Sequence, residues 1–143
     1  MKESEKDNLF ITFKGVIESI IEDKQKNLKN LKNLNKFEAK INFGLQIQDD
    51  YVFWVNLIAK DGNYKLGRDK IENYDLEIIS DPEDLMYFSS GRYSTLHMMF
   101  KKNKFGFRKL RYKKGNTGKS YLGILLKLPK ILVLDKIKPL NKK

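Results

Sequence analysis

Side chains suited to catalysis or metal binding are scarce in this sequence of 143 residues. It contains no cysteine and one histidine, His97, which excludes thiolate nucleophiles, disulfides and histidine-rich metal sites. No serine, acid or second imidazole stands at a spacing from His97 that indicates a catalytic triad. We therefore expect a protein that is not an enzyme and that needs no cofactor.

Two other segments carry residue types that could bind a phosphate or a metal. The segment GNTGKS, residues 115–120, ends like a phosphate-binding loop, but Lys113 stands where such a loop requires its first glycine. Asp81, Glu83 and Asp84 could ligate a metal, yet they also match the first turn of a helix, where a capping Asp and further acids are favourable. We interpret the first segment as a basic loop and the second as a helix start.

The net charge of +11 is concentrated in the last third of the chain. Residues 100–143 hold 15 basic residues and one acid, Asp135, whereas residues 1–99 hold 14 basic and 17 acidic residues. This asymmetry indicates an anionic partner, either nucleic acid or an anionic membrane surface. Because 25 of the 29 basic residues are Lys, a biased base composition would explain the charge equally well. The start of the chain has no apolar stretch of signal-peptide length, so we expect a cytoplasmic protein.

The first half of the chain predicts a helix followed by an antiparallel meander. Apolar residues from Leu9 to Ile21 recur at helical spacing and predict a helix over residues 8–23. The Lys-Asn-Leu triplets that follow are interpreted as a frayed helical extension or a linker. The predicted strands, the first of them half-buried, cover residues 37–47, 51–59, 64–66 and 74–79. Gly62 suits the tight turn between the second and third strands.

The second half predicts two short helices, a fifth strand and an apolar C-terminal helix. Asp81 and Pro82 begin a helix that Gly91 ends, and a second helix follows over residues 94–102. Alternating residues predict the fifth strand over 105–112.

The apolar segment after residue 120 is too short for a membrane span, which needs roughly 20 apolar residues. We expect a single domain overall, with an N-terminal helix and linker at 1–36, the main body at 37–134 and a basic tail at 135–143.

The segment FKKNKFGFRKLRYKK, residues 100–114, mixes basic and aromatic residues as nucleic-acid-binding segments do. Its candidate contacts are Lys101, Lys102, Lys104, Arg108, Lys109 and Arg111 beside Phe105, Phe107 and Tyr112. The alternation of Phe105 and Phe107 places both rings on the buried face of the predicted strand, where they could not stack on bases. Nucleic acid is therefore the less favoured partner.

Two packing questions stay open at this stage. The second half is rich in Leu, Met and Phe, and helices of this kind over a sheet enclose a cavity as readily as a solid core. Trp54 lies on the strand face opposite Phe53 and Val55. We expect it to be partly buried under the N-terminal helix, with an exposed anchor for dimerisation as the alternative.

The order of elements resembles the sterol carrier protein type 2 domain over about residues 37–134. The stretch that carries the resemblance is YKLGRDKIENYDLEIISDPEDLMYFSSGRYSTLHMMFKKNKFGFRKL. The matching positions, at the ends of strands and helices, are Gly67, Asp75, Gly91, Asn103-Lys104 and Gly115. The chain departs from the family at residues 102–105, where Gly-Lys-Leu is usual, and in a longer loop at 113–120.

This resemblance implies an α+β fold in which helices pack on one face of a five-stranded, mainly antiparallel sheet and enclose an apolar tunnel. It implies non-catalytic binding or transfer of a fatty acyl, sterol or isoprenoid lipid. The implied lining residues are Phe88, Leu96, Met99, Phe100, Phe105, Phe107, Leu122, Leu125 and Leu126. The residues expected to contact an anionic membrane surface are Lys101, Lys102, Lys104, Lys113, Lys114 and Lys119. The alternatives are an accessory subunit that presents a lipid or quinone to an enzyme, and a basic nucleic-acid-associated protein.

Overall fold

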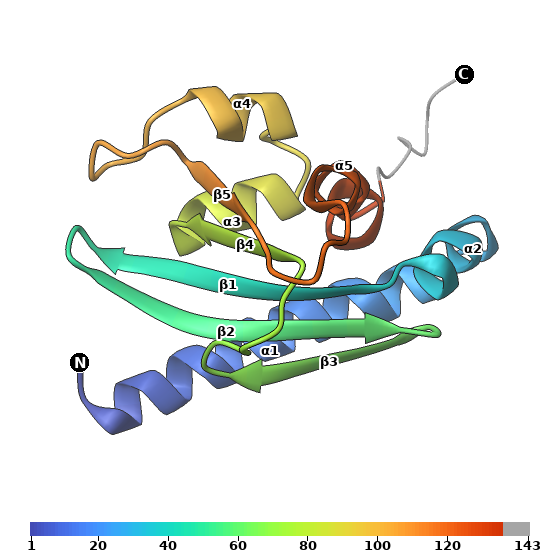
Figure 1. Ribbon diagram of the computed structural model, residues 1–143, viewed down its shortest axis with the longest axis horizontal. Coiled ribbons are helices and arrows are strands. Elements are labelled where there is room, and N and C mark those ends of the chain that lie inside the picture. The colour runs from blue at the N-terminus through green and yellow to red at the C-terminus, as the bar shows by residue number, and fades with distance from the viewer. Residues whose placement is uncertain (136–143) are drawn as a thin grey trace, which may run out of the picture.

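The computed structural model describes residues 1–135, so the predicted basic tail lies outside the described residues except for Asp135. Five helices and five strands follow one another along this part of the chain (Figure 1). Their bounds are α1 Glu3–Gln25, α2 Leu28–Lys36, β1 Ala39–Gln48, β2 Tyr51–Lys60, β3 Asn63–Arg68, β4 Leu76–Ser80, α3 Pro82–Ser89, α4 Thr95–Phe100, β5 Leu110–Lys114 and α5 Tyr121–Leu132.

The strands form one sheet in the order β3-β2-β1-β4-β5. The β1–β2, β2–β3 and β4–β5 pairs are antiparallel, and the β1–β4 pair is parallel. The turn between β2 and β3 has positive φ at two consecutive residues, Asp61 (52°) and Gly62 (80°), as tight hairpins require. The predicted α+β class with a mainly antiparallel five-stranded sheet is confirmed.

One face of the sheet is apolar and carries the helices. Ile41, Phe43 and Leu45 on β1 are at most 3% exposed and pair with apolar residues of β2, and the first two also pair with apolar residues of β4. Helix α1 runs across this face, behind the strands in the view of Figure 1. The ring of Phe13 on α1 meets the ring of Phe43, with 6.0 Å between their centroids. The core therefore lies between the sheet and its helices.

The opposite face of the sheet is covered by the connection from β3 to β4, which passes in front of β1 and β2 in Figure 1. The side chain of Asn42 makes two hydrogen bonds with the backbone of Ile71, at 3.1 and 2.9 Å, and is fully buried. The amide of Asn56 donates to the carbonyls of Arg68 and Asp69. The prediction that β1 is half-buried is therefore wrong, because this connection covers its polar face.

Trp54 lies on this second face, so the expectation that it packs under α1 is also wrong. Its ring contacts the ammonium of Lys70, which lies 4.3 Å from the ring centroid, and it is half-buried. Gly44 on β1 lies beneath it, since a Cβ there would come within 2.9 Å of the indole.

Two further predictions need correction. The Lys-Asn-Leu segment is a regular helix, α2, which Asn27 caps and which buries Leu34 to 1% exposure. The fifth strand begins at Leu110 instead of residue 105. The side-chain oxygen of Asn103 accepts hydrogen bonds from the amides of Phe105 and Phe107, at 2.9 and 3.1 Å, and so folds residues 103–107 into a turn.

Candidate functional site

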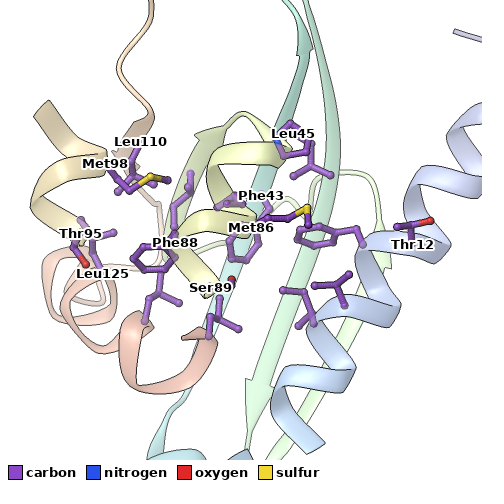
Figure 2. A pocket seen from close by; sticks show the side chains of 18 of the residues that line it. Thr12, Phe43, Leu45, Met86, Phe88, Ser89, Thr95, Met98, Leu110 and Leu125 are labelled. Atoms are coloured by element: carbon purple, nitrogen blue, oxygen red, sulfur yellow. The ribbon is translucent and has the colours of Figure 1, made fainter. Parts of the chain in front are cut away.

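The helices and the sheet enclose an apolar cavity of about 120 Å³ (Figure 2). Its walls come from α1, β1, β4, α3, α4, β5 and α5. The lining residues are Leu9, Thr12, Phe13, Val16, Ile17, Phe43, Leu45, Ile78, Pro82, Leu85, Met86, Phe88, Ser89, Thr95, Met98, Leu110, Leu125, Leu128 and Leu132. The helices and sheet therefore leave a cavity between them instead of a solid core, the two outcomes that hydrophobic periodicity could not distinguish.

The lining offers almost no hydrogen bonds. Among residues 1–135, Thr12, Ser89 and Thr95 contribute the only polar side chains of the lining, and no charged residue lines the cavity. The cavity is open on one side, because Val16 on α1 is 41% exposed and Met86 on α3 is 64% exposed. Met86 points from α3 into the space between α3 and α1 (Figure 2). We call this side the α1–α3 opening.

Helix α3 is held in place by its first turn. The carboxylate of Asp81 caps it by accepting from the amide of Glu83 at 2.8 Å, as the sequence predicts. Asp84 does more than favour the helix dipole, because its carboxylate lies 2.9 Å from the ammonium of Lys109 and both side chains are largely buried. Burial by itself lowers the pKa of Lys109, but the hydrogen bond and charge of Asp84 outweigh it, so that the pKa is raised.

A short strap after α5 ties the cavity walls together. We use this name for residues 133–135. The ammonium of Lys24, at the end of α1, donates to the carbonyl of Val133 at 2.7 Å and to the carboxylate of Asp135 at 3.1 Å. The same carboxylate accepts from the amide of Asn30 on α2 at 2.7 Å. On the other side, the amide of Leu134 donates to the carbonyl of Ser89 at the end of α3.

The strap holds a buried cation. The side chain of Lys24 is only 4% exposed, whereas that of Asp135 is 28% exposed. The hydrogen bond from Asn30 is the largest of the effects that lower the pKa of Asp135, and the bond and charge of Lys24 add to it against the opposing effect of burial. The strap therefore connects α1, α2, α3 and α5, and three of these helices, α1, α3 and α5, form walls of the cavity.

Two of the nine predicted lining residues, Phe88 and Leu125, line the cavity. Four of the others are 46–72% exposed: Leu96, Phe100, Leu122 and Leu126. The remaining three, Met99, Phe105 and Phe107, are half-buried outside the lining. Sequence spacing does not determine the rotation of α4 and α5 about their axes. Residues 103–107 form a turn where a strand was predicted, and Phe105 and Phe107 therefore do not point into the cavity as that strand would have directed them. As contacts to a ligand, all nine stay a prediction.

The sequence reasoning missed the contribution of α1. Leu9, Phe13, Val16 and Ile17 line the cavity, whereas their helical spacing predicts only a helix with one apolar face. The spacing shows that a helix face is apolar, and it is the same for a face against a solid core and a face against a cavity.

The six Lys residues expected to contact a membrane do not form one cluster. Lys101 and Lys102 follow α4, whereas Lys113 and Lys114 lie at the other end of β5. The ammonium of Lys104 lies 3.6 Å from Asp81, and that of Lys119 lies 3.6 Å from Glu38. Both ammonium groups are thus engaged with acids of the same chain.

The remaining chemical candidates have structural roles. His97 stacks on Tyr93 with 4.2 Å between ring centroids, and its Nε2 has no hydrogen-bond partner among residues 1–135. In the loop at 115–120, the side chain of Asn116 accepts from the amide of Tyr74 and donates to the carbonyl of Glu72. The loop is thereby fastened to the segment before β4.

No protein-family model matches the chain, and no curated protein matches its sequence. Solved structures match its fold. The sterol carrier protein domain 2 of Helicoverpa armigera has 18% identity and a TM-score of 0.55, with 85% of this chain and 89% of that chain covered. The ubiquinone synthesis protein UbiJ-SCP2 has 8% identity and a TM-score of 0.58, with 89% of this chain and 95% of that chain covered. Apo sterol carrier protein 2 from Yarrowia lipolytica has 18% identity and a TM-score of 0.50, with 82% of this chain and 88% of that chain covered.

These likenesses show that the chain adopts a sterol carrier protein 2-like fold over 82–89% of its length, as the sequence resemblance predicts. Across the same residues, no helix is both long enough and apolar enough to cross a membrane.

Proposed function

We propose that the protein binds a lipid non-covalently, through the hydrocarbon chain, and carries it without catalysing a reaction. The observation that supports this proposal is the cavity, whose lining is apolar apart from three hydroxyl groups. Solved proteins named as sterol carriers share the fold, which adds support from structural analogy.

The lining determines which part of a lipid could enter. A polar headgroup moved into this cavity would lose its hydrogen bonds to water and find few replacements, which is costly. A hydrocarbon chain loses nothing of this kind and gains about 0.8 kcal/mol for each methylene that leaves water. We therefore place the chain in the cavity and the headgroup at the α1–α3 opening.

The cavity volume bears on how a long chain binds. An apolar cavity of about 150 Å³ holds a benzene-sized ligand, so the 120 Å³ found here suits only the end of a chain. A longer chain would displace side chains at the opening, such as the flexible side chain of Met86, which is 64% exposed. A 16-carbon chain buried whole after such a displacement would gain about 12 kcal/mol against association costs of about 4–15 kcal/mol, so that binding would be reversible.

The cavity supports a specific set of contacts. We propose that Phe88 and Leu125, which were predicted from sequence and line the cavity, contact the chain together with Phe13, Phe43 and Met98 from three other walls.

A second candidate function uses the same cavity. The protein could present its lipid to a partner enzyme, and the match to a solved ubiquinone synthesis protein over 95% of that chain favours this candidate. Copurification of a defined enzyme that takes up the lipid from this protein would distinguish presentation from simple transfer.

Uptake of a fluorescent fatty acid by the purified protein tests the proposal. Met86→Glu places a charge in the α1–α3 opening, and Thr95→Phe adds a ring to the cavity wall. We expect each to weaken uptake at least about tenfold, which corresponds to 1.4 kcal/mol. The matched control is Leu28→Glu, on an α2 residue that is 81% exposed and outside the lining. Full uptake by both cavity variants would contradict the proposal.

A further inference from the structure

Helix α4 has two apolar faces. Thr95 and Met98 face the cavity, whereas Leu96 and Phe100, four residues apart on one side of the helix, are each 65% exposed. Phe100 is the last of the six residues of α4, and Lys101 and Lys102 follow it directly. A small exposed apolar face thus lies on the same helix as two residues that line the cavity.

Cations border this exposed face. Lys102 forms a β-bridge with Arg108, and the guanidinium of Arg108 lies 5.9 Å from the centroid of the Phe100 ring and donates to the carbonyl of Met99. Lys101 and Lys102 are exposed and have no ion pair within residues 1–135. We call Leu96, Phe100, Lys101, Lys102 and Arg108 the α4 patch.

Acids are missing from the surrounding sequence. Residues 85–134 contain twelve Lys and Arg and neither Asp nor Glu. The two acids just before this stretch that approach it, Asp81 and Asp84, are already engaged with Lys104 and Lys109. The charge of the α4 patch is therefore left to an outside anion.

A second helix that exposes apolar residues, α1, has the opposite charge, whereas α5 exposes Leu122 and Leu126. Helix α1 exposes Ile11 (66%) and Val16 (41%), but it carries six acids and three bases. Thr12 on α1 and Thr95 on α4 lie on opposite sides of the cavity (Figure 2). An anionic surface would attract the α4 side and repel the α1 side, which defines one orientation.

We propose that the α4 patch docks the protein on an anionic phospholipid bilayer, with Leu96 and Phe100 entering the headgroup region while Lys101, Lys102 and Arg108 meet lipid phosphates. Exposed aliphatic and aromatic residues among cations are typical of interfacial membrane binding. Base stacking by nucleic acid is less suited to the patch, because Leu96 offers no ring and Arg108 covers one face of Phe100. The purpose of docking, but not its chemistry, rests on the proposed lipid binding.

Cosedimentation of the full chain with vesicles tests the docking. Binding is measured on phosphatidylcholine vesicles with and without phosphatidylglycerol. Each cation near such a surface contributes enough for about a fivefold change in binding, so we expect Lys101→Gln with Lys102→Gln to weaken binding about 25-fold, while Phe100→Ser also weakens it.

The matched controls remove the same charge or the same exposure elsewhere. Lys113→Gln with Lys114→Gln alters the far end of β5, and Ile11→Ser alters α1; we expect each control to retain most of the binding. If the variant with Lys113→Gln and Lys114→Gln lost as much vesicle binding as the variant with Lys101→Gln and Lys102→Gln, the proposal would be overturned, since net charge alone would then explain binding. It would also be overturned by tighter binding of single-stranded DNA that the α4 variants abolish, or by self-association between the α4 and α1 faces.

The fatty-acid uptake assay without vesicles separates this proposal from the previous one. The variant with Lys101→Gln and Lys102→Gln should take up the probe normally, because neither residue belongs to the predicted or the observed lining. Loss of vesicle binding with normal uptake supports docking, whereas absent uptake in the unaltered protein refutes lipid binding and leaves the vesicle result to be judged alone.

Discussion

Removing the charge of Asp135 should destabilise the protein more than removing the charge of its partner, Lys24. The asymmetry follows from burial, since the Lys24 side chain is 4% exposed and the Asp135 side chain 28% exposed. In Asp135→Asn the ammonium stays buried without a counter-charge, and the new amide faces two donors, Lys24 and Asn30, with one acceptor oxygen. In Lys24→Met the carboxylate keeps Asn30 and gains water.

The expected magnitudes follow from these partners. Breaking a buried pair costs about 3–5 kcal/mol, and we expect about 3 kcal/mol for Asp135→Asn because the carbonyl of Val133 still accepts from Lys24. Lys24→Met loses one charged hydrogen-bond set, about 2 kcal/mol. The double variant should be more stable than Asp135→Asn alone, because no buried charge is then left unpaired.

Urea unfolding followed by circular dichroism measures these differences. With an m-value of about 2 kcal/mol/M, Asp135→Asn should lower the midpoint by about 1.5 M. The pKa of Asp135 is lowered in the folded state, so its contribution is present above the unfolded value of about 3.9 and is lost as the pH falls through the folded pKa. Asp135→Asn should lack this acid-dependent loss. A smaller cost for Asp135→Asn than for Lys24→Met would refute the reasoning.

Three further predictions concern stability. Burial raises the pKa of Tyr64 to about 12. The neutral Tyr64 side chain therefore contributes to the free energy of unfolding below about pH 10, and this contribution is lost as the pH rises through 12. Tyr64→Phe should remove this alkaline dependence of stability, measured by urea unfolding. Gly15→Ala in α1 should stabilise by about 1 kcal/mol in thermal unfolding, because a Cβ there meets nothing within 4 Å. Gly115→Ala should destabilise by about 3 kcal/mol, because its Cβ would lie 2.0 Å from the carbonyl oxygen of Tyr74; a stable Gly115→Ala protein would show that this loop packs differently.

Local signals in the sequence were sufficient for most of the fold. The Asp81 cap, the turn at Gly62 and the apolar spacing of α1 depend on neighbours within a few residues, and all three appear as predicted. The burial of Asn42 could not be predicted in this way, because it depends on the connection from β3 to β4, 29 residues further along the chain at Ile71.

The site was less predictable than the fold. Alternation placed Phe105 and Phe107 in a strand, but the side chain of Asn103 bonds both amides and forms a turn instead. In α5, Leu125 and Leu126 are chemically identical, yet one lines the cavity and the other is exposed. Only the rotation of the helix against the sheet distinguishes them, and this rotation is set by tertiary packing.

Mass spectrometry of the purified protein tests the central claim most directly. Native spectra give the mass of the intact protein with anything bound, and spectra of an organic extract identify what is released. We expect a near-stoichiometric lipid with a hydrocarbon chain, and we expect Thr95→Phe to retain less of it than Leu28→Glu. A protein that is empty as purified and that stays empty after incubation with fatty acid would contradict lipid binding in the cavity.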